Sequence, residues 1–559
     1  MGLILLHAAY IFLTFLQVPL NSDHANQVLQ AADILKGNIL LKGWNLTGVS
    51  FYLSELPFYV FGTALRGVDT WAYLIAASLM VICLSLLGFL LSFNNHQRNG
   101  LEKALIYLTL TGFPTITWLG YLRGHCAIFI YLCLLLLIIE RIFRETGESS
   151  KQERSKSNTS QEIHNSGKTS AALWGVLGLL TAFGCMSDMQ LLIIGILPIL
   201  LFCGINLLQN EPRFDVRKTL LMSGVTICGT VLGVLLDKLL MVFGSINKNS
   251  FLDTRKFADL DALGVKAKLL WKGILNVFRT DITQNGWHIR DIIAFSAAII
   301  IISLTVYLLI STLLRFVRKG DGDPVSVTLS FSIAVMCTLC FFTDIYTAED
   351  SARYISYLPF AAGILICRDL DRRLYEPDEE NKEKLPDKRI RNEHNSSSRA
   401  PFGQNTGQFP KFRMLFCLMG FLIAGLGSFV PPVFLPPETP QDRLAAILEE
   451  NDLRDGYADF WNASHTTVAS KGNVRVRAIR GQVPELGKPD YMEMQNWFCK
   501  TDWYRERPHN FIVFDGKGYL HVSEDVVLAL LGEPGRIIDT DEYRIYIYDR
   551  DLNQEIVIK

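Results

Sequence analysis

Long apolar runs alternate with short polar segments over the first three quarters of the chain. Crossing about 30 Å of hydrocarbon takes roughly 20 helical residues with few charges. The pattern therefore predicts a mainly α, polytopic membrane protein. We expect eleven membrane-spanning helices, near residues 3–21, 71–93, 103–121, 125–142, 170–187, 190–208, 219–241, 292–314, 326–343, 352–367 and 413–433.

The segments between these runs are of two kinds. Residues 22–70 and 244–290 mix apolar positions near helical spacing with polar ones, which is typical of helices lying at the outer membrane interface. Residues 147–168 and 376–410 are rich in Ser, Asn, Lys and Glu, and they hold too few apolar side chains to order themselves. We interpret both as flexible cytoplasmic loops. The membrane domain as a whole is expected to cover residues 1–433.

A separate domain follows the last apolar run. Successive prolines in PPVFLPPETP (431–440) favour an extended, stiff tether. Beyond it, residues 441–454 look helical, and the stretches at 473–481, 509–514 and 542–549 are apolar or alternate as strands do. Residues 434–559 are therefore predicted to form a small α/β domain.

Composition and charge fit a membrane protein. The chain has 559 residues, of which 50% are hydrophobic and 19% charged, and a net charge of -1 gives no general attraction to nucleic acid. With the N-terminus inside, about 25 Lys and Arg residues fall in the inner loops and about five in the short outer loops. The segment 244–291 adds about eight Lys and Arg residues on the outer side, which does not reverse the excess in the inner loops. We therefore expect a multi-pass protein of the cell membrane with an extracytoplasmic C-terminal domain.

Four polar clusters fall on the predicted outer side. They contain Asp23 after the first run, Arg123 and His125 in YLRGHCAIF, Asp188 in GCMSDMQLL, and Arg353 in TDIYTAEDSARYISYLPF. The charge-free runs that follow Arg123 and Arg353 are only about 24 Å and 21 Å long as helices, which is less than the bilayer thickness. Charges held near membrane depth in this way are more often functional than decorative.

Each of these residues also has an ordinary structural explanation. Asp23 alone suits a solvated loop or a helix cap, and Asp188 suits the N-cap of the next helix. His125 fits a satisfied interfacial histidine, and Arg353 fits an (i, i+4) ion pair with Glu349. The joint pattern is stronger evidence for a site than any one member.

The residues and their order resemble the GT-C superfamily of membrane glycosyltransferases, which use lipid-phosphate-linked sugars. The similarity rests on a short first span, an Asp at the head of the first outer loop, interfacial helices and a C-terminal extracytoplasmic domain. More narrowly, SDHANQVLQAADILKGNILLKGW, the SD turn at 187–188, the RY at 353–354 and LRDGYADFWNASHTTVASKGNVRVRAI resemble bacterial multi-spanning proteins similar to the family 39 and O-mannosyltransferase-like groups. Many members carry two adjacent acidic residues where this chain reads Asp23-His24.

The resemblance implies transfer of a hexosyl or pentosyl group from a polyprenyl-phosphate donor to an acceptor in the cell envelope, a glycan, lipid or protein. Such a transfer needs a carboxylate to take the acceptor proton and cationic groups to stabilise the phosphate leaving group. Asp23 is the candidate base, and Arg353 with His125 or Arg123 are the candidate phosphate binders. Asp188 is a candidate metal ligand or second acidic group, with Mg²⁺ or Mn²⁺ as the cation if one is used.

Two other classes of function remain open. A transporter or flippase is the main rival, although the hydropathy shows no internal repeat. A non-catalytic scaffold for envelope assembly is the other. For the C-terminal domain we expect a role in positioning the acceptor, with its aromatic residues as flat surfaces for sugar rings: Tyr457, Phe460, Trp461, Trp497, Trp503 and Tyr504.

Overall fold

The computed structural model describes residues 2–93, 100–153, 162–244, 247–248, 256–280, 288–375, 409–482, 491–516 and 524–558. Of the two segments predicted as flexible loops, 376–410 lies almost entirely outside these residues, at 376–408, whereas 147–168 lies outside them only at 154–161. Residues 147–153 and 162–168 are helical, so the prediction of a loop is wrong for them. The helices on either side of the first of them extend to Glu153 and begin at Glu162.

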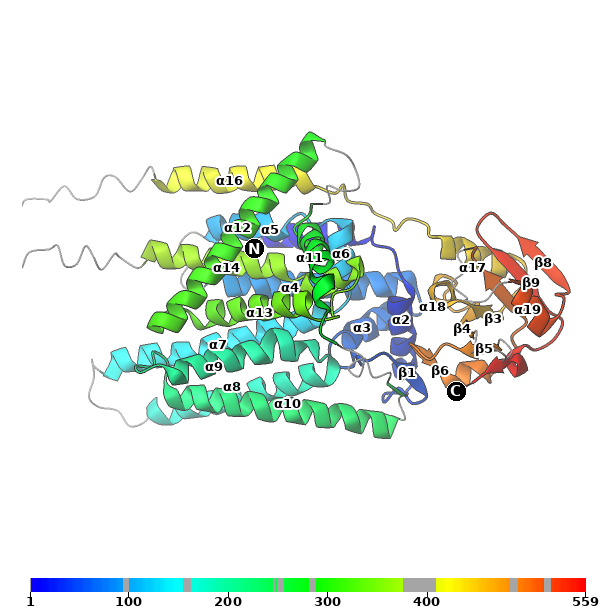
Figure 1. Cartoon of the computed structure of the whole chain (residues 1–559), viewed down its shortest axis with the longest axis horizontal. Helices are drawn as coiled ribbons and strands as arrows, with labels where there is room; N and C mark the ends of the chain where they lie inside the picture. The colour runs from blue at the N-terminus through cyan, green and yellow to red at the C-terminus, as the bar shows by residue number, and fades with distance from the viewer. Residues whose placement is uncertain are drawn as a thin grey trace, which may run out of the picture.

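A bundle of long helices forms one end of the molecule and the C-terminal domain forms the other (Figure 1). We call the end of the bundle near that domain the domain end, and the opposite end the far end. The bundle helices are α1 (Gly2–Phe15), α4 (Thr70–Ser92), α5 (Gly100–Thr111), α6 (Ile116–Leu122), α7 (Cys126–Glu153), α8 (Glu162–Ser187), α9 (Leu197–Leu208), α10 (Val216–Gly244), α12 (Ile289–Lys319), α13 (Pro324–Phe342), α14 (Leu358–Tyr375) and α16 (Phe409–Ser428).

Within the described residues, five helical segments are long and apolar enough to cross a membrane: Thr70–Ser92, Cys126–Arg144, Val216–Gly244, Ile289–Lys319 and Pro324–Phe342. They match five of the eleven predicted spans. Four other predicted spans are shorter apolar helices of 10–17 residues, namely Leu5–Phe15, Ala171–Ser187, Leu192–Leu208 and Met414–Ser428. The helical, apolar character of these runs is confirmed, whereas the number of eleven spans stays a prediction.

Two of the predicted spans are not continuous α-helices. The run near 103–121 becomes α5 and α6, which meet at an angle of 91°. Pro114 lies at the break, where it has no N–H to donate to a continuous helix, and Thr115 caps the new helix by accepting from the Trp118 amide. The run near 352–367 begins with a 3₁₀ turn, η4 (Glu349–Ile355), so its helix α14 starts later than predicted.

Three shorter helices lie outside the long bundle, at its domain end. They are α2 (Ser22–Leu35), α3 (Leu56–Arg66) and α11 (Leu263–Val277), and α2 runs across the direction of the long helices (Figure 1). Their positions agree with the amphipathic helices expected at 22–70 and 244–290. The segment between α2 and α3 also holds a short strand, β1 (Trp44–Leu46).

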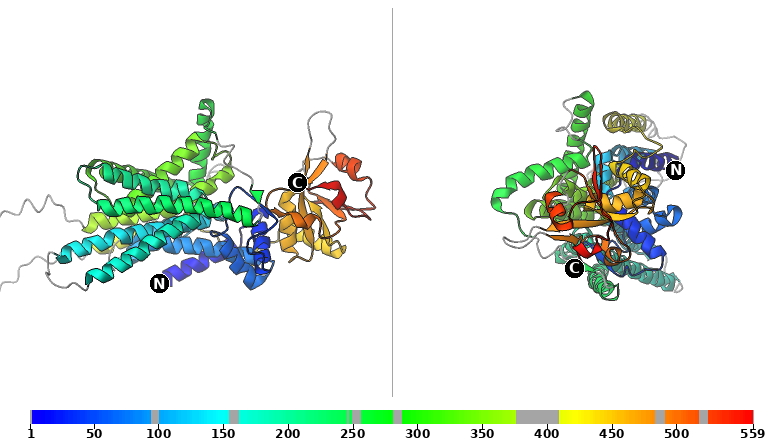
Figure 2. Two further views of the ribbon diagram at one scale, coloured as in Figure 1. Left: turned by 90° about the horizontal axis from the view of Figure 1, so that it is seen from below. Right: turned by 90° about the vertical axis from the view of Figure 1, so that its right-hand side faces the viewer.

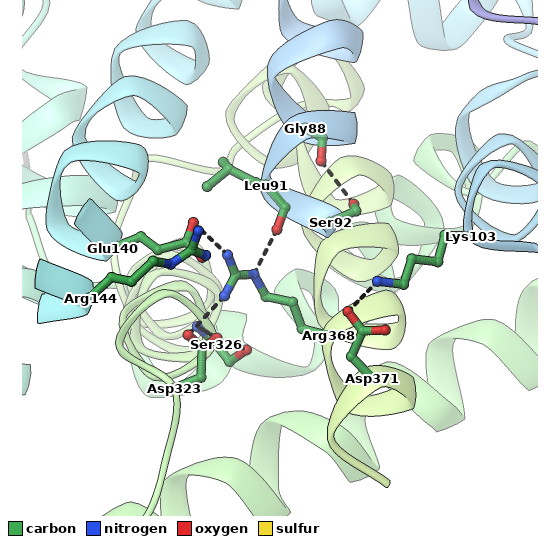
Figure 3. Close-up of polar contacts among 10 residues, drawn as sticks. All are labelled: Gly88, Leu91, Ser92, Lys103, Glu140, Arg144, Asp323, Ser326, Arg368 and Asp371. Atoms are coloured by element: carbon green, nitrogen blue, oxygen red, sulfur yellow. Dashed lines mark hydrogen bonds and ion pairs between the residues drawn. The ribbon is translucent and has the colours of Figure 1, made fainter. Parts of the chain in front are cut away.

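A network of buried charges joins four helices at the far end (Figure 3). The Arg368 guanidinium of α14 contacts Glu140 of α7 and Asp323 before α13, each at 2.8 Å, and donates to the Leu91 carbonyl of α4 at 2.6 Å. Lys103 of α5 pairs with Asp371 beside it. Buried charges are tolerated when they are paired in this way. This network fixes the far ends of the helices against one another.

The C-terminal region is a mixed seven-stranded sheet flanked by helices, in the order β10-β5-β4-β3-β7-β9-β8. Strands β3, β4 and β7 are parallel neighbours, and β5, β8 and β9 add antiparallel pairs. The helices and strands are α17 (Pro440–Glu450), β3 (Asp455–Ala458), α18 (Phe460–Ala469), β4 (Arg475–Gln482), β5 (Tyr491–Met494), β6 (Cys499–Lys500), β7 (Phe511–Phe514), α19 (Glu524–Leu531), β8 (Arg536–Asp539), β9 (Arg544–Ile547) and β10 (Ile556–Val557). The predicted helix and three predicted strands correspond to α17, β4, β7 and β9.

The C-terminal region is joined to the bundle by backbone as well as side-chain contacts. Strand β1 pairs with β6 of the C-terminal region on one side and with β2 (Asn247–Lys248) on the other. Figure 2 shows the same region at the end of the long helices in a second view. Because a three-stranded sheet is shared by three distant parts of the sequence, the position of the C-terminal region relative to α2 is set by hydrogen bonds and not only by the tether.

Candidate active site between the helix bundle and the C-terminal domain

Helix α2 places Asp23 at the domain end of the bundle. Asn21 is the N-cap and its side chain accepts from the His24 amide at 3.2 Å, so Asp23 in the first turn is not used as the cap. Its neighbours on α2 hold α18 of the C-terminal domain. Ser22 donates to the Trp461 carbonyl, and Asn26 accepts from Ser464, both at 2.8 Å. The carboxylate therefore lies at the junction of the two parts.

Two arginines and a tryptophan surround Asp23. Burial raises the pKa of its carboxyl group, while the charges of Arg353 and Arg123 and a hydrogen bond from the Trp497 indole act to lower it. Asp350 adds a smaller opposing charge. Residues from two distant segments of the helix bundle, and one from the C-terminal domain, thus act on a single carboxylate.

Arg123 is anchored by backbone and phenol oxygens. Its guanidinium donates to the Pro19 carbonyl, which lies just before α2, and to the Tyr73 hydroxyl of α4 at 3.4 Å. Neither partner is an anion, so its positive charge is not neutralised by these contacts. That charge is directed toward Asp23, and it also lowers the pKa of His24 after the larger effect of burial.

His125 and Asp188 form a buried pair. The His125 Nδ1 lies 2.5 Å from the Asp188 Oδ2, and the two residues are 8% and 3% exposed. Burial opposes the charged imidazole, yet the adjacent Asp188 carboxylate outweighs it and raises the pKa of His125. The His125 backbone has φ 65°, a left-handed conformation that costs about 1–2 kcal/mol for a residue with a Cβ. Backbone strain of this kind favours a functional role for the position of the His125 imidazole ring.

Asp188 also caps the helix that follows it. Its second oxygen, Oδ1, accepts from the Gln190 amide at 2.8 Å. The capping explanation considered from the sequence is therefore correct, and the pairing with His125 is added to it. Both carboxylate oxygens have a protein partner, which makes Asp188 the acidic partner of His125 more readily than a metal ligand.

Arg353 is oriented by its own turn and not by Glu349. Its Nη2 donates to the Tyr354 hydroxyl at 3.4 Å and its guanidinium carbon lies 5.2 Å from the Tyr354 ring centre. Its buried Nε has no hydrogen-bond partner among the described residues. Glu349 instead pairs with Lys272 of α11 at 2.5 Å. The alternative explanation of an ion pair within the turn is therefore wrong, and the charge of Asp23 acts on Arg353 after the larger effects of burial and Tyr354.

Helix α11 holds the segment that carries Arg353. The Lys266 ammonium donates to the Thr343 and Tyr346 carbonyls at 2.8 Å and 3.2 Å. Gly273 faces the Tyr346 hydroxyl so closely that a Cβ there would lie 1.7 Å from it. Close packing at Gly273 and the contacts of Lys266 and Lys272 hold the loop before η4 in place. The backbone that carries Arg353 is therefore rigid.

Sequence reasoning missed several members of this cluster. Glu55, just before α3, is 1% exposed, and its Oε2 accepts from Gln27 of α2 at 3.2 Å. The Tyr59 hydroxyl bonds the His24 Nδ1 at 3.1 Å. The spacing of Glu55 and Tyr59, one helical turn apart, was the available signal, but an apolar surrounding sequence (LSELPFYVF) hid it. Trp497 was counted only as one aromatic residue of the C-terminal domain.

The aromatic residues of that domain divide into several classes. Tyr457 and Tyr504 are buried in the domain core, and Trp503 packs on Trp44 with ring centres 4.9 Å apart. Trp461 is 45% exposed, whereas Trp497 bonds Asp23. Tyr457 and Tyr504 are therefore not available for the expected acceptor surface. The domain instead contributes the Trp497 side chain to the surroundings of the candidate base.

The described residues do not form a site suited to a divalent cation. They include no group of three or more His, Cys, Asp and Glu side chains placed to hold a metal ion. Asp188 is used by His125 and Gln190, and Asp23 faces two arginines, whose charges repel a cation.

Comparisons with known proteins found no relative of this chain. No protein-family model matches the chain, and no curated protein or solved structure matches it.

Proposed function

We propose that the protein is a membrane glycosyltransferase of the GT-C type, which transfers a sugar from a polyprenyl-phosphate donor to an extracytoplasmic acceptor. The observation that supports it best is the meeting of Asp23, Arg123 and Arg353 at one end of an apolar helix bundle. A carboxylate beside two arginines is the combination that a proton-accepting group and a phosphate leaving group require.

The membrane arrangement is part of this proposal. The five long apolar helices are compatible with it, and the shorter ones would complete about eleven spans. The domain end then faces the outside, with α2, α3 and α11 at the interface and the C-terminal domain beyond them. A lipid-linked donor would present its phosphate at this level, because its chain stays in the hydrocarbon region.

The proposed step is an inverting single displacement. The acceptor hydroxyl oxygen forms a bond to the anomeric carbon while the bond from that carbon to the phosphate oxygen breaks. Asp23 takes the hydroxyl proton, and the electron pair of the broken bond remains on the polyprenyl phosphate. Arg353 and Arg123 stabilise the charge that develops there, since a guanidinium donates to phosphate oxygens in pairs. His125, held by Asp188, supplies a third cationic group nearby. The described residues do not suit a divalent cation, so no step is assigned to one.

The direct test uses purified protein and a panel of polyprenyl-phosphate sugars, with release of polyprenyl phosphate as the measurement. Asp23→Asn is nearly isosteric, so it should keep the fold and donor binding while lowering turnover by at least about a hundredfold. Asp259→Asn is the matched control, because this carboxylate is exposed before α11 and makes no cap hydrogen bond. Wild-type turnover in the Asp23 variant would refute its role as the base. Flux of an intact lipid or solute without release of phosphate would favour a transporter, and neither activity would favour a scaffold.

A further inference from the structure

Glu55 is an anomaly in the candidate site. It lies immediately before α3 and is 1% exposed, and its side chain does not cap that helix. One oxygen, Oε2, accepts from the Gln27 amide, and the backbone N–H of His125 also acts on the carboxylate, but Oε1 makes no hydrogen bond of normal geometry in the described structure. A buried, charged carboxylate with an unmet oxygen is costly, because its lost hydration is not replaced.

Protonation removes most of that cost. The Gln27 Oε1, on the side chain already bonded to Glu55, is another buried oxygen without a hydrogen bond of normal geometry in the described structure, although this side chain also acts on His24. A carboxyl proton on the Glu55 Oε1 turns an acceptor into a donor and supplies what this amide oxygen lacks. The structure around Glu55 is therefore better suited to the acid than to the carboxylate.

The groups around Glu55 tune its proton affinity in both directions. Burial raises the pKa of Glu55 to about 7, His125 and the Gln27 hydrogen bond act to lower it, and the Asp188 charge acts to raise it. Tyr59 on α3 and Cys126 at the start of α7 also face it, and Tyr59 stays neutral because burial raises its pKa. A carboxyl group balanced in this way responds to any new charge nearby.

We propose that Glu55 takes up a proton when an anionic phosphate ligand binds beside Arg123 and Arg353. This rests on the proposed function for the place of the phosphate. The sign follows from electrostatics: an added negative charge disfavours the carboxylate and favours the acid. The net charge in the site is then adjusted by Glu55.

The test measures protons directly. Farnesyl phosphate, a short polyprenyl phosphate, is titrated into the full-length protein by calorimetry at pH 8 in buffers of different ionisation enthalpy. The wild type should take up as much as about one proton per ligand, and its affinity should fall by up to tenfold per pH unit above pH 7. Glu55→Gln keeps the shape and the Gln27 contact, so it should bind with most of the uptake lost.

Three comparisons make the result specific. Asp23→Asn should retain most of the uptake, which excludes the other carboxyl group of the site as its source. Glu438→Gln, an exposed residue of the tether, should behave as the wild type. Equal uptake in the wild type and in Glu55→Gln would overturn the proposal.

An infrared titration of the unliganded protein separates this proposal from the proposed function. It should show a protonated carboxyl band that disappears near pH 7 in the wild type and is missing in Glu55→Gln. If the band is present but farnesyl phosphate does not bind, the phosphate site fails, and the linked proton uptake with it, while Glu55 keeps its titration. If the band is missing from the wild type, the proposal for Glu55 is wrong whatever the ligand does.

Discussion

The hydrogen bond from Trp497 to Asp23 gives a sharp prediction about the C-terminal domain. This bond favours the ionised carboxylate, which is the form that a general base requires, against the burial that favours the acid. Trp497→Phe keeps an aromatic ring and removes only the N–H donor. The pKa of Asp23 should therefore rise in this variant, and under the proposed function a larger share of the protein should be inactive at acidic pH.

The size of the effect follows from the kind of bond. A hydrogen bond to a charged group contributes about 1.5–3 kcal/mol, which corresponds to roughly 10- to 150-fold in an equilibrium. On the acid side of the rate profile, kcat/KM of Trp497→Phe should fall toward this range. At alkaline pH, where Asp23 is ionised in both proteins, the two rates should converge, because the remaining base and arginines are unchanged.

The assay is a pH profile of polyprenyl-phosphate release by the wild type, Trp497→Phe and Trp461→Phe. Trp461 belongs to the same domain and its hydrogen bond with α2 uses its backbone carbonyl, so its variant should follow the wild-type profile. A pH-independent loss in Trp497→Phe would point to a packing role for the ring. An unchanged profile in a folded variant would refute the reasoning and return the C-terminal domain to a purely external role.

Three further predictions concern the buried charges. Arg368→Met should cost about 3–5 kcal/mol of unfolding free energy, because two carboxylates lose their partner; Arg144→Ala, which also loses a bond to Glu140 but is half-exposed, should cost at most about 1 kcal/mol in the same denaturation assay. Asp188→Asn should destabilise the protein by about 1.5–3 kcal/mol at low pH. Since the pKa of His125 is raised in the folded protein, this difference should be fully present below about pH 6.5 and disappear as the pH rises through the folded value, and a pH-independent difference would contradict it. Sugar transfer should persist in EDTA, because arginines supply the positive charge, and loss that Mg²⁺ or Mn²⁺ restores would refute this.

The sequence by itself determined which segments are apolar helices and where the polar clusters lie. Periodicity and run length report the local environment of each residue, so they predicted the long helices and the strands β4, β7 and β9. They also singled out Asp23, Arg123, His125, Asp188 and Arg353, because charges beside short apolar runs are conspicuous. Helix breaks depend on local sterics too, yet Pro114 was overlooked because the hydropathy of its run is continuous.

Only the tertiary structure decided which polar groups meet. The pairing of His125 with Asp188, the separation of Arg353 from Glu349 and the contact between Asp23 and Trp497 join residues far apart in the chain. Glu55 was overlooked in the sequence because its chemistry comes from burial, and burial depends on α2 and α7 packing against it. A carboxyl group in an apolar stretch is an ordinary residue until the fold removes its water.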